Sequence, residues 1–233
     1  MDFLPTATST DEAERSASIA VLPIGSFEQH GRHLPLSTDT IVACAVAQAV
    51  AEHYDLLLLP PVTISCSHEH SDFAGTVSIS AATLYAVVRD VAASLEQRGI
   101  HKLVLVNGHG GNYVLGNVVQ EANVGVPRMA LFPHRDDWEQ ARKAGGLVTS
   151  NHEDMHGGEL ETSIRLHVAP HLVRDDAEDW VAPDRTHLHQ LGMSAYSTSG
   201  IIGRPSLASA DRGRLVLEEL VGLLEAHLGH LAN

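Results

Sequence analysis

The sequence is poor in aromatic residues and in basic residues. Phe, Trp and Tyr make up only 4% of its 233 residues, so the core must rest mainly on Ala, Val, Leu and Ile. Lys and Arg number 15 against 29 Asp and Glu, which gives a formal charge of −14 at pH 7. A protein that tracks phosphates needs a basic face, so this balance argues against a nucleic-acid partner and against an anionic membrane surface.

The sequence also has few cysteines and no long apolar run. Its purest apolar stretch, 41–51, is interrupted by Gln48 and is far shorter than the roughly 20 residues of a membrane span. Residues 1–18 lack the basic start and apolar stretch of a secretory signal, and we interpret them as a mobile tail. Two cysteines, Cys44 and Cys66, do not make a disulfide framework, so we expect a cytoplasmic protein.

Short apolar runs alternate with amphipathic segments along the first half of the chain. The runs predict strands at 19–24, 56–59, 102–106 and 128–132. The amphipathic segments predict helices at 38–53 (with Thr38 as N-cap), 81–98, 114–123, 135–144, 159–167 and 215–231. Continuous apolar strands between helices predict a mostly parallel sheet covered on both faces, a three-layer α/β/α domain. We expect one domain over 19–233, with 168–208 as an ordered excursion.

The first polar cluster follows the first predicted strand. In extended backbone, residues i and i+2 point the same way, so Glu28 and His30 can face one spot. Asp39 follows near a helix start, where backbone N–H groups favour a carboxylate. Glu, His and Asp are metal-ligand types, so this cluster suggests a metal site. The alternative is that Asp39 only caps its helix and Glu28 is solvated.

Two more clusters follow the other strands. His109 lies among glycines directly after 102–106, where it could be a ligand, a base or part of a turn. The loop is not a Walker loop, and Tyr113 breaks a dinucleotide-binding pattern. Ser67 and His70 belong to a polar stretch after the second strand, and we expect them to line a pocket wall.

A last cluster surrounds the predicted helix 159–167. Glu159 would lie at the positive end of that helix, and His156 on the loop before it. A simple capping arrangement is the alternative. Two divalent cations would balance the carboxylates of Glu28, Asp39 and Glu159 together with one bridging hydroxide, as a partly buried metal pair requires.

The chain resembles the creatininase (creatinine amidohydrolase) family in four motifs that occur in order: VLPIGSFEQHGRHLPLSTDT, FAGTVSIS, LVLVNGHGGN and HGGELETS. The resemblance extends from about residue 19 to the closing helix. It implies a three-layer domain with two divalent metal ions, zinc first with manganese or iron as alternatives, in a homo-oligomer that is commonly a hexamer. It also implies that Glu28, Asp39 and His109 bind one metal, and that His30, Asp39 and a further Glu bind the other.

The position of that further Glu differs between family members. In creatininase it lies two residues after the His of the third-strand motif, where this chain has Gly111. Other members carry it in the HGGE-type motif, so we expect Glu159 to be the ligand, and creatinine becomes a weaker candidate substrate. A family peptidase that trims the mycofactocin precursor has His at the position of Glu159, which makes this chain look less like that peptidase.

The function predicted from these residues is hydrolysis of a C–N bond other than a peptide bond, by a hydroxide that bridges two metals. The substrate would be a small cyclic or linear amide, similar to creatinine, a lactam or a formamide. We expect His156 to protonate the leaving nitrogen, with Glu153 as a second catalytic candidate. The expected substrate contacts are Ser67, His70, Gly110, Gly111 and Trp180. A peptidase that tailors a mycofactocin-type precursor peptide and a non-catalytic family relative are the alternatives.

Overall fold

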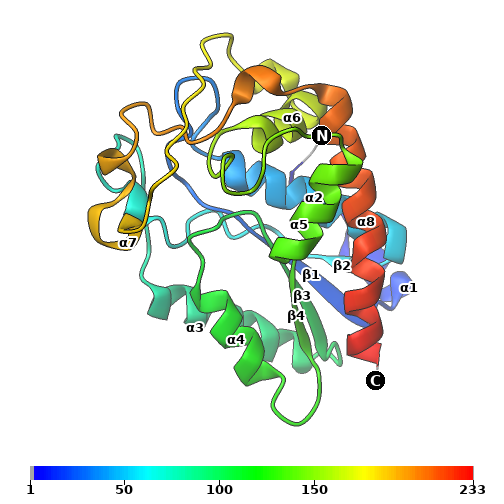
Figure 1. The fold of residues 1–233 in the computed structure, drawn as a ribbon. Coiled ribbons are helices and arrows are strands. Elements are labelled where there is room, and N and C mark those ends of the chain that lie inside the picture. The colour runs from blue at the N-terminus through cyan, green and yellow to red at the C-terminus, as the bar shows by residue number, and fades with distance from the viewer. Residues whose placement is uncertain (1–2, 233) are drawn as a thin grey trace.

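The computed structural model describes residues 3–232, so the first two residues of the expected tail and Asn233 of the expected domain lie outside the described residues. Four strands form one parallel sheet in the order β2-β1-β3-β4 (Figure 1). They are β1 (Ile19–Ile24), β2 (Leu57–Leu58), β3 (Lys102–Asn107) and β4 (Met129–Phe132). The predicted parallel sheet is confirmed, with β2 shorter than its apolar run.

Helices cover both faces of the sheet (Figure 1). One face packs against α2 (Thr38–Tyr54), α5 (Arg135–Ala144), α6 (Glu159–Val168) and α8 (Ala210–Ala232), and the other against α3 (Ala81–Glu96) and α4 (Val114–Ala122). Val21 and Phe132 point to the first layer, whereas Leu22 and Met129 point to the second. Because both faces are covered, the strands are apolar throughout. The three-layer α/β/α architecture is confirmed. Among residues 3–232, no helix is long and apolar enough to cross a membrane.

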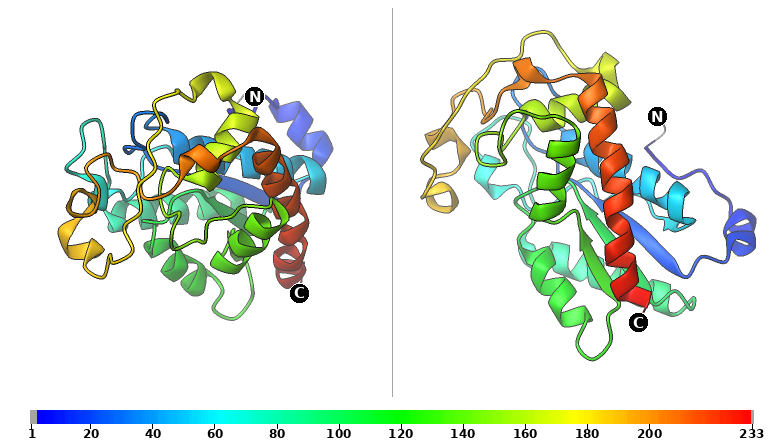
Figure 2. Two further views of the ribbon diagram at one scale, coloured as in Figure 1. Left: turned by 45° about the horizontal axis from the view of Figure 1, so that its top comes forward. Right: turned by 45° about the vertical axis from the view of Figure 1, so that its right-hand side comes forward.

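Shorter elements lie outside these layers. Within the segment expected to be a tail, α1 (Ser9–Arg15) begins at a capping box between Thr8 and Asp11, and the Arg15 guanidinium donates to the carbonyl oxygen of Leu56 at 2.9 Å. Figure 2 shows α1 at the edge of the molecule. The remaining elements are α7 (Leu188–Leu191) and the 3₁₀ turns η1 (His68–His70), η2 (Pro170–Leu172), η3 (Met193–Ala195) and η4 (Pro205–Leu207).

The segment 168–208, expected to be an ordered excursion, pairs with the loop before α6 through one isolated bridge, between His156 and Ile202. A second bridge, between Trp180 and Gly203, lies within the segment itself. Thr38, predicted to be an N-cap, is instead the first residue of α2, and its hydroxyl donates to the carbonyl oxygen of Pro35 at 2.7 Å.

Two glycines let α2 begin at the carboxyl ends of the central strands. β1 and β3 end side by side, with Ile24 opposite Asn107, and Gly25 and Gly108 follow directly. A Cβ on Gly25 would lie 2.2 Å from Cα of Thr40, and one on Gly108 would lie 2.4 Å from the carbonyl oxygen of Asp39. The first turn of α2 therefore fits between the two strand ends only because both residues lack a side chain.

We expect Gly25→Ala to lower the free energy of unfolding by about 1–3 kcal/mol, the usual cost of overfilling a packed site. Gly116→Ala in α4 is the matched control, because a Cβ there meets nothing within 4 Å. That change should stabilise the protein by up to about 1 kcal/mol through helix propensity. Urea unfolding measures both, and equal stability of the two variants would contradict the close approach of α2.

Candidate metal centre

Three buried side chains meet where α2 begins between the ends of β1 and β3. The Asp39 carboxylate faces an imidazole with each oxygen: Oδ1 lies 2.9 Å from Nε2 of His30, and Oδ2 lies 2.9 Å from Nδ1 of His109. The other ring nitrogens are held by the backbone. His30 Nδ1 donates to the carbonyl oxygen of Glu28 at 3.0 Å, and His109 Nε2 to that of Cys66 at 2.8 Å. The nitrogens that face Asp39 are therefore the ones free to bind a ligand.

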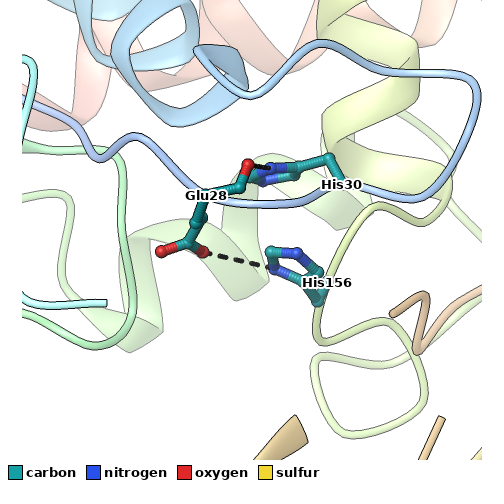
Figure 3. A group of neighbouring side chains, drawn as sticks. All are labelled: Glu28, His30 and His156. Atoms are coloured by element: carbon teal, nitrogen blue, oxygen red, sulfur yellow. Dashed lines mark hydrogen bonds and ion pairs between the residues drawn. The ribbon is translucent and has the colours of Figure 1, made fainter. Parts of the chain in front are cut away.

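The Glu28 carboxylate belongs to the same cluster. Its side chain is fully buried, yet neither oxygen accepts a hydrogen bond. Oε1 lies 3.2 Å from His109 Nδ1. It lies 3.8 Å from His156 Nδ1 (Figure 3). A buried carboxylate without donors is costly unless a cation compensates it. The orphaned oxygens of Glu28 therefore fit a bound metal ion.

Glu161, rather than Glu159, supplies the remaining carboxylate. Glu161 Oε1 lies 3.9 Å from His30 Nε2. The Glu159 carboxylate instead accepts hydrogen bonds from the backbone and hydroxyl of Thr149, at 3.0 and 2.6 Å, and pairs with Arg212 of α8 at 2.6 Å. At 3.6 residues per turn, side chains two positions apart point about 200° apart. The expectation for Glu159 is corrected accordingly, because the helix turns that side chain toward α8.

Two groups of ligand atoms share Asp39. Glu28, Asp39 and His109 form one group, and His30, Asp39 and Glu161 form the other; within each group the ligand atoms lie within 4.8 Å of one another. A third group of the same compactness joins Glu28, His30 and His156 (Figure 3). Nitrogen and carboxylate ligands in such sets suit zinc, manganese or iron. The donors thus fit one or two divalent ions.

The metal-free cluster holds protons where metals would bind. Burial opposes charge on His30, but the Asp39 carboxylate overcomes it and raises the pKa of His30 to about 9. Glu28 and Asp39 likewise raise the pKa of His109 well above its usual value, against the effect of burial. Burial raises the pKa of Glu161 to about 8. A metal must therefore displace protons from this site.

His70 and His156 lie beside the cluster as a pair of neutral imidazoles. Their rings are 4.4 Å apart, and His156 is 4.1 Å from the ring of His30. Burial lowers the pKa of His70 to about 4, and burial followed by the repulsion from His30 lowers the pKa of His156 well below its usual value. Gln29 holds both rings. Its side-chain Nε2 donates to His70 Nδ1 at 2.9 Å, and its backbone carbonyl oxygen accepts from His156 Nε2 at 2.6 Å.

Four other residues expected at the site either bond elsewhere or have no hydrogen-bond partner there. The Glu153 carboxylate accepts from the backbone and hydroxyl of Ser150, at 3.1 and 3.0 Å, within its own loop. Trp180 is 48% exposed, and its indole donates to the carbonyl oxygen of Tyr196. The Ser67 hydroxyl is buried without a hydrogen-bond partner. Gly110 faces open space.

Gly111 and Glu69 lie directly against His109. A Cβ on Gly111 would lie 2.4 Å from His109 Nε2 and 2.2 Å from Glu69 Oε1. Glu69 Oε1 itself is 3.6 Å from His109 Nε2. Sequence reasoning did not single out Gln29, Glu69 and Glu161 as site residues, although each lies within a polar cluster of the sequence. Gln29 stands between Glu28 and His30, Glu69 stands next to His70, and Glu161 is the second acidic residue of the HGGELETS motif.

The fold and these donors define an α/β metalloprotein whose ligands gather at the carboxyl ends of parallel strands. The family model for creatininase, described as creatinine amidohydrolase, matches residues 5–228. The chain therefore belongs to the creatininase family, whose members are metal-dependent hydrolases that act on C–N bonds.

Individual relatives differ in the substrate that their names give. The chain is 39% identical to the mycofactocin precursor peptide peptidase of Mycobacterium ulcerans, over 94% of this chain and 87% of that one. It is 27% identical to the creatinine amidohydrolase of Pseudomonas putida, over 89% and 88%. A crystal structure of creatininase has a TM-score of 0.82 at 26% identity, over 96% and 95%. Solved creatininases include a manganese form and a zinc–zinc variant.

We expect Glu161→Gln to weaken one metal site at least about tenfold, because it removes a charged ligand. Glu159→Gln should keep the metals but lower the free energy of unfolding by about 1–3 kcal/mol, because it leaves buried donors unpaired. Metal analysis and denaturant unfolding of both variants check this. Metal loss confined to Glu159→Gln would restore Glu159 as the ligand.

Metal binding should release protons and strengthen with pH. With the pKa of His30 near 9, the metal-free site is protonated at pH 7 and loses that proton only as the pH rises through 9. Affinity for zinc should therefore increase between pH 7 and 9, by up to about tenfold per pH unit for each proton displaced. Calorimetry in buffers of different ionisation enthalpy measures the proton release. A pH-independent affinity would contradict these protonation states.

Proposed function

We propose that this protein is a metal-dependent peptidase that hydrolyses an amide bond of a precursor peptide. The observation that carries the proposal is the 39% identity to a mycofactocin precursor peptide peptidase over 94% of this chain. That likeness exceeds the 27% identity to a creatinine amidohydrolase of the same family. It favours the peptide alternative over the small non-peptide amide that the sequence motifs suggested.

Two divalent ions would be held by the two groups that share Asp39. Glu28, Asp39 and His109 would bind one, and His30, Asp39 and Glu161 the other. Zinc or manganese is proposed, because solved creatininases carry those metals. When bound, such ions lower the pKa of water to near neutrality and polarise a carbonyl group. The homo-oligomer and the cytoplasmic location stay predictions.

His156 is the residue proposed to move the proton. Its Nε2 donates to the carbonyl oxygen of Gln29, so Nδ1 carries the lone pair, and that atom faces the Glu28 carboxylate at 3.8 Å. A neutral imidazole fixed beside the reacting groups can accept a proton and return it to a leaving nitrogen. Gln29 keeps the ring in place through its backbone, and its side chain bonds His70 and the carbonyl oxygen of Gly200.

Hydrolysis of a small amide is the second candidate. It is favoured by the likeness to solved creatininases, one of which is a variant in complex with creatine, with a TM-score of 0.77. Creatinine, lactams and formamides would then enter the same centre. Gly111 separates this chain from creatininase at the position where the family resemblance implies a Glu.

The test is a substrate panel given to zinc- and manganese-loaded protein, with random peptide mixtures on one side and creatinine, lactams and formamides on the other. We expect cleaved peptides with new amino termini, detected by mass spectrometry.

His156→Ala should retain metal and lower kcat by roughly 10²–10⁴-fold, the usual scale of acid–base catalysis.

Each other outcome has a definite meaning. Turnover of small amides without peptide cleavage would refute the peptidase and support the second candidate. A fully metallated protein inert toward both would be a non-catalytic relative. Loss of metal in His156→Ala would identify His156 as a ligand, a role that its group with Glu28 and His30 would also allow.

A further inference from the structure

A groove opens beside the metal centre between η1, α7 and the start of α4. Its volume is about 580 Å³, within the roughly 300–1,000 Å³ of typical ligand sites. Tyr113 and Leu191 form an apolar outer rim and are 62% and 55% exposed. The Tyr113 ring rests edge-on against that of His189. No group of the proposed reaction uses this groove.

The inner end of the groove is continuous with the metal centre. Cys66, Glu69 and Gly111 line it, and all three also touch or closely approach His109. The carbonyl oxygen of Cys66 accepts from His109 Nε2 at 2.8 Å, and Glu69 Oε1 lies 3.6 Å from the same nitrogen. A chain lying in the groove would therefore reach the imidazole whose other nitrogen faces Glu28 and Asp39.

The carboxylates of the groove give it a negative charge. Its lining includes the carboxylates of Glu69 and Asp72 and the imidazoles of His68 and His189, and neither Lys nor Arg among the described residues. Asp72 accepts a hydrogen bond from the hydroxyl of Ser194, whereas Glu69 is the carboxylate next to the centre. The absence of a side chain on Gly111 is what leaves room for Glu69 Oε1, because a Cβ would lie 2.2 Å from it. An anionic segment would be repelled here, and a cationic one attracted.

We propose that this groove binds the stretch of peptide next to the scissile bond, and that Glu69 selects a Lys or Arg side chain in that stretch. This inference rests on the proposed peptidase function and adds the substrate class to it. The cationic group lies against Glu69 at the inner end, and an apolar residue farther along packs against Tyr113 and Leu191. Glu69 is thus a specificity-determining residue rather than a metal ligand.

The test begins with a peptide that the metal-loaded enzyme cleaves. Each position flanking the cleaved bond is replaced in turn by Lys, norleucine or Glu, so that norleucine keeps the length of Lys without its charge. At one position, Lys should raise kcat/KM about tenfold or more over norleucine, mainly through KM, as expected for a hydrogen bond to a charged partner. Glu at that position should lower kcat/KM below the norleucine value.

Glu69→Gln should abolish the preference for Lys, measured as the ratio of kcat/KM for the Lys peptide to kcat/KM for the norleucine peptide, while the metal content stays unchanged. Glu139→Gln on α5 is the matched control, because it removes one exposed carboxylate remote from the groove. That variant should keep the full preference. The lysine-containing cleavage product should also inhibit wild-type enzyme more strongly than it inhibits Glu69→Gln, which measures binding without turnover.

Three results would overturn the inference and leave the peptidase function standing. The first is that Lys has no advantage at any flanking position although peptides are cleaved. The second is that the preference persists in Glu69→Gln, which would place its origin elsewhere. Loss of metal in Glu69→Gln would show that Glu69 supports His109 instead of the substrate. Failure of the wild-type enzyme to cleave any peptide refutes the proposed function itself and this inference with it.

Discussion

The structure depends on one carboxylate held between two imidazoles. Asp39 faces His30 with one oxygen and His109 with the other, and it is 1% exposed. His30 comes from the loop after β1 and His109 from the loop after β3, so Asp39 ties the two strand ends together. It can do so because Gly25 and Gly108 allow α2 to begin between them. The same carboxylate belongs to both candidate ligand groups.

Two acidic residues outside the cluster, Asp154 and Glu159, fix the position of Glu161, the acidic residue that α6 contributes to the cluster. Asp154 accepts hydrogen bonds from the first two backbone N–H groups of α6, at 2.6 and 2.9 Å, and pairs with Arg142 at 2.7 Å. Glu159 ties the same turn to Arg212 on α8. With the start of α6 anchored in this way, the helical phase leaves Glu161 facing His30. Charged side chains outside the candidate ligand groups thus fix the position of a candidate ligand.

The sequence predicts the sheet well because strands that are buried on both faces are continuous apolar runs between amphipathic segments. The predicted run 19–24 is the range of β1 itself. It also brings Glu28, His30, Asp39 and His109 to one place, since ligands after parallel strands share an edge. It fails between Glu159 and Glu161, because two acidic residues in one helical turn differ only in which neighbouring helix they face. That choice depends on Arg212, which lies 53 residues away in the chain. The sequence does not predict helix α1, because its seven residues are too few to show a helical period.

The four histidines of the site divide by tautomer, and the backbone decides the division. In His30, His109 and His156 one ring nitrogen donates to a carbonyl oxygen, so the other turns toward the carboxylates and can hold a metal or a proton. His70 is reversed: its Nδ1 accepts from Gln29, so Nε2 must carry the hydrogen, and Nε2 lies 3.2 Å from Glu28 Oε1 without forming a hydrogen bond to it. His70 therefore cannot ligate a metal in this tautomer. One residue type thus supplies both candidate metal ligands and a neighbour that is not a ligand within a single cluster.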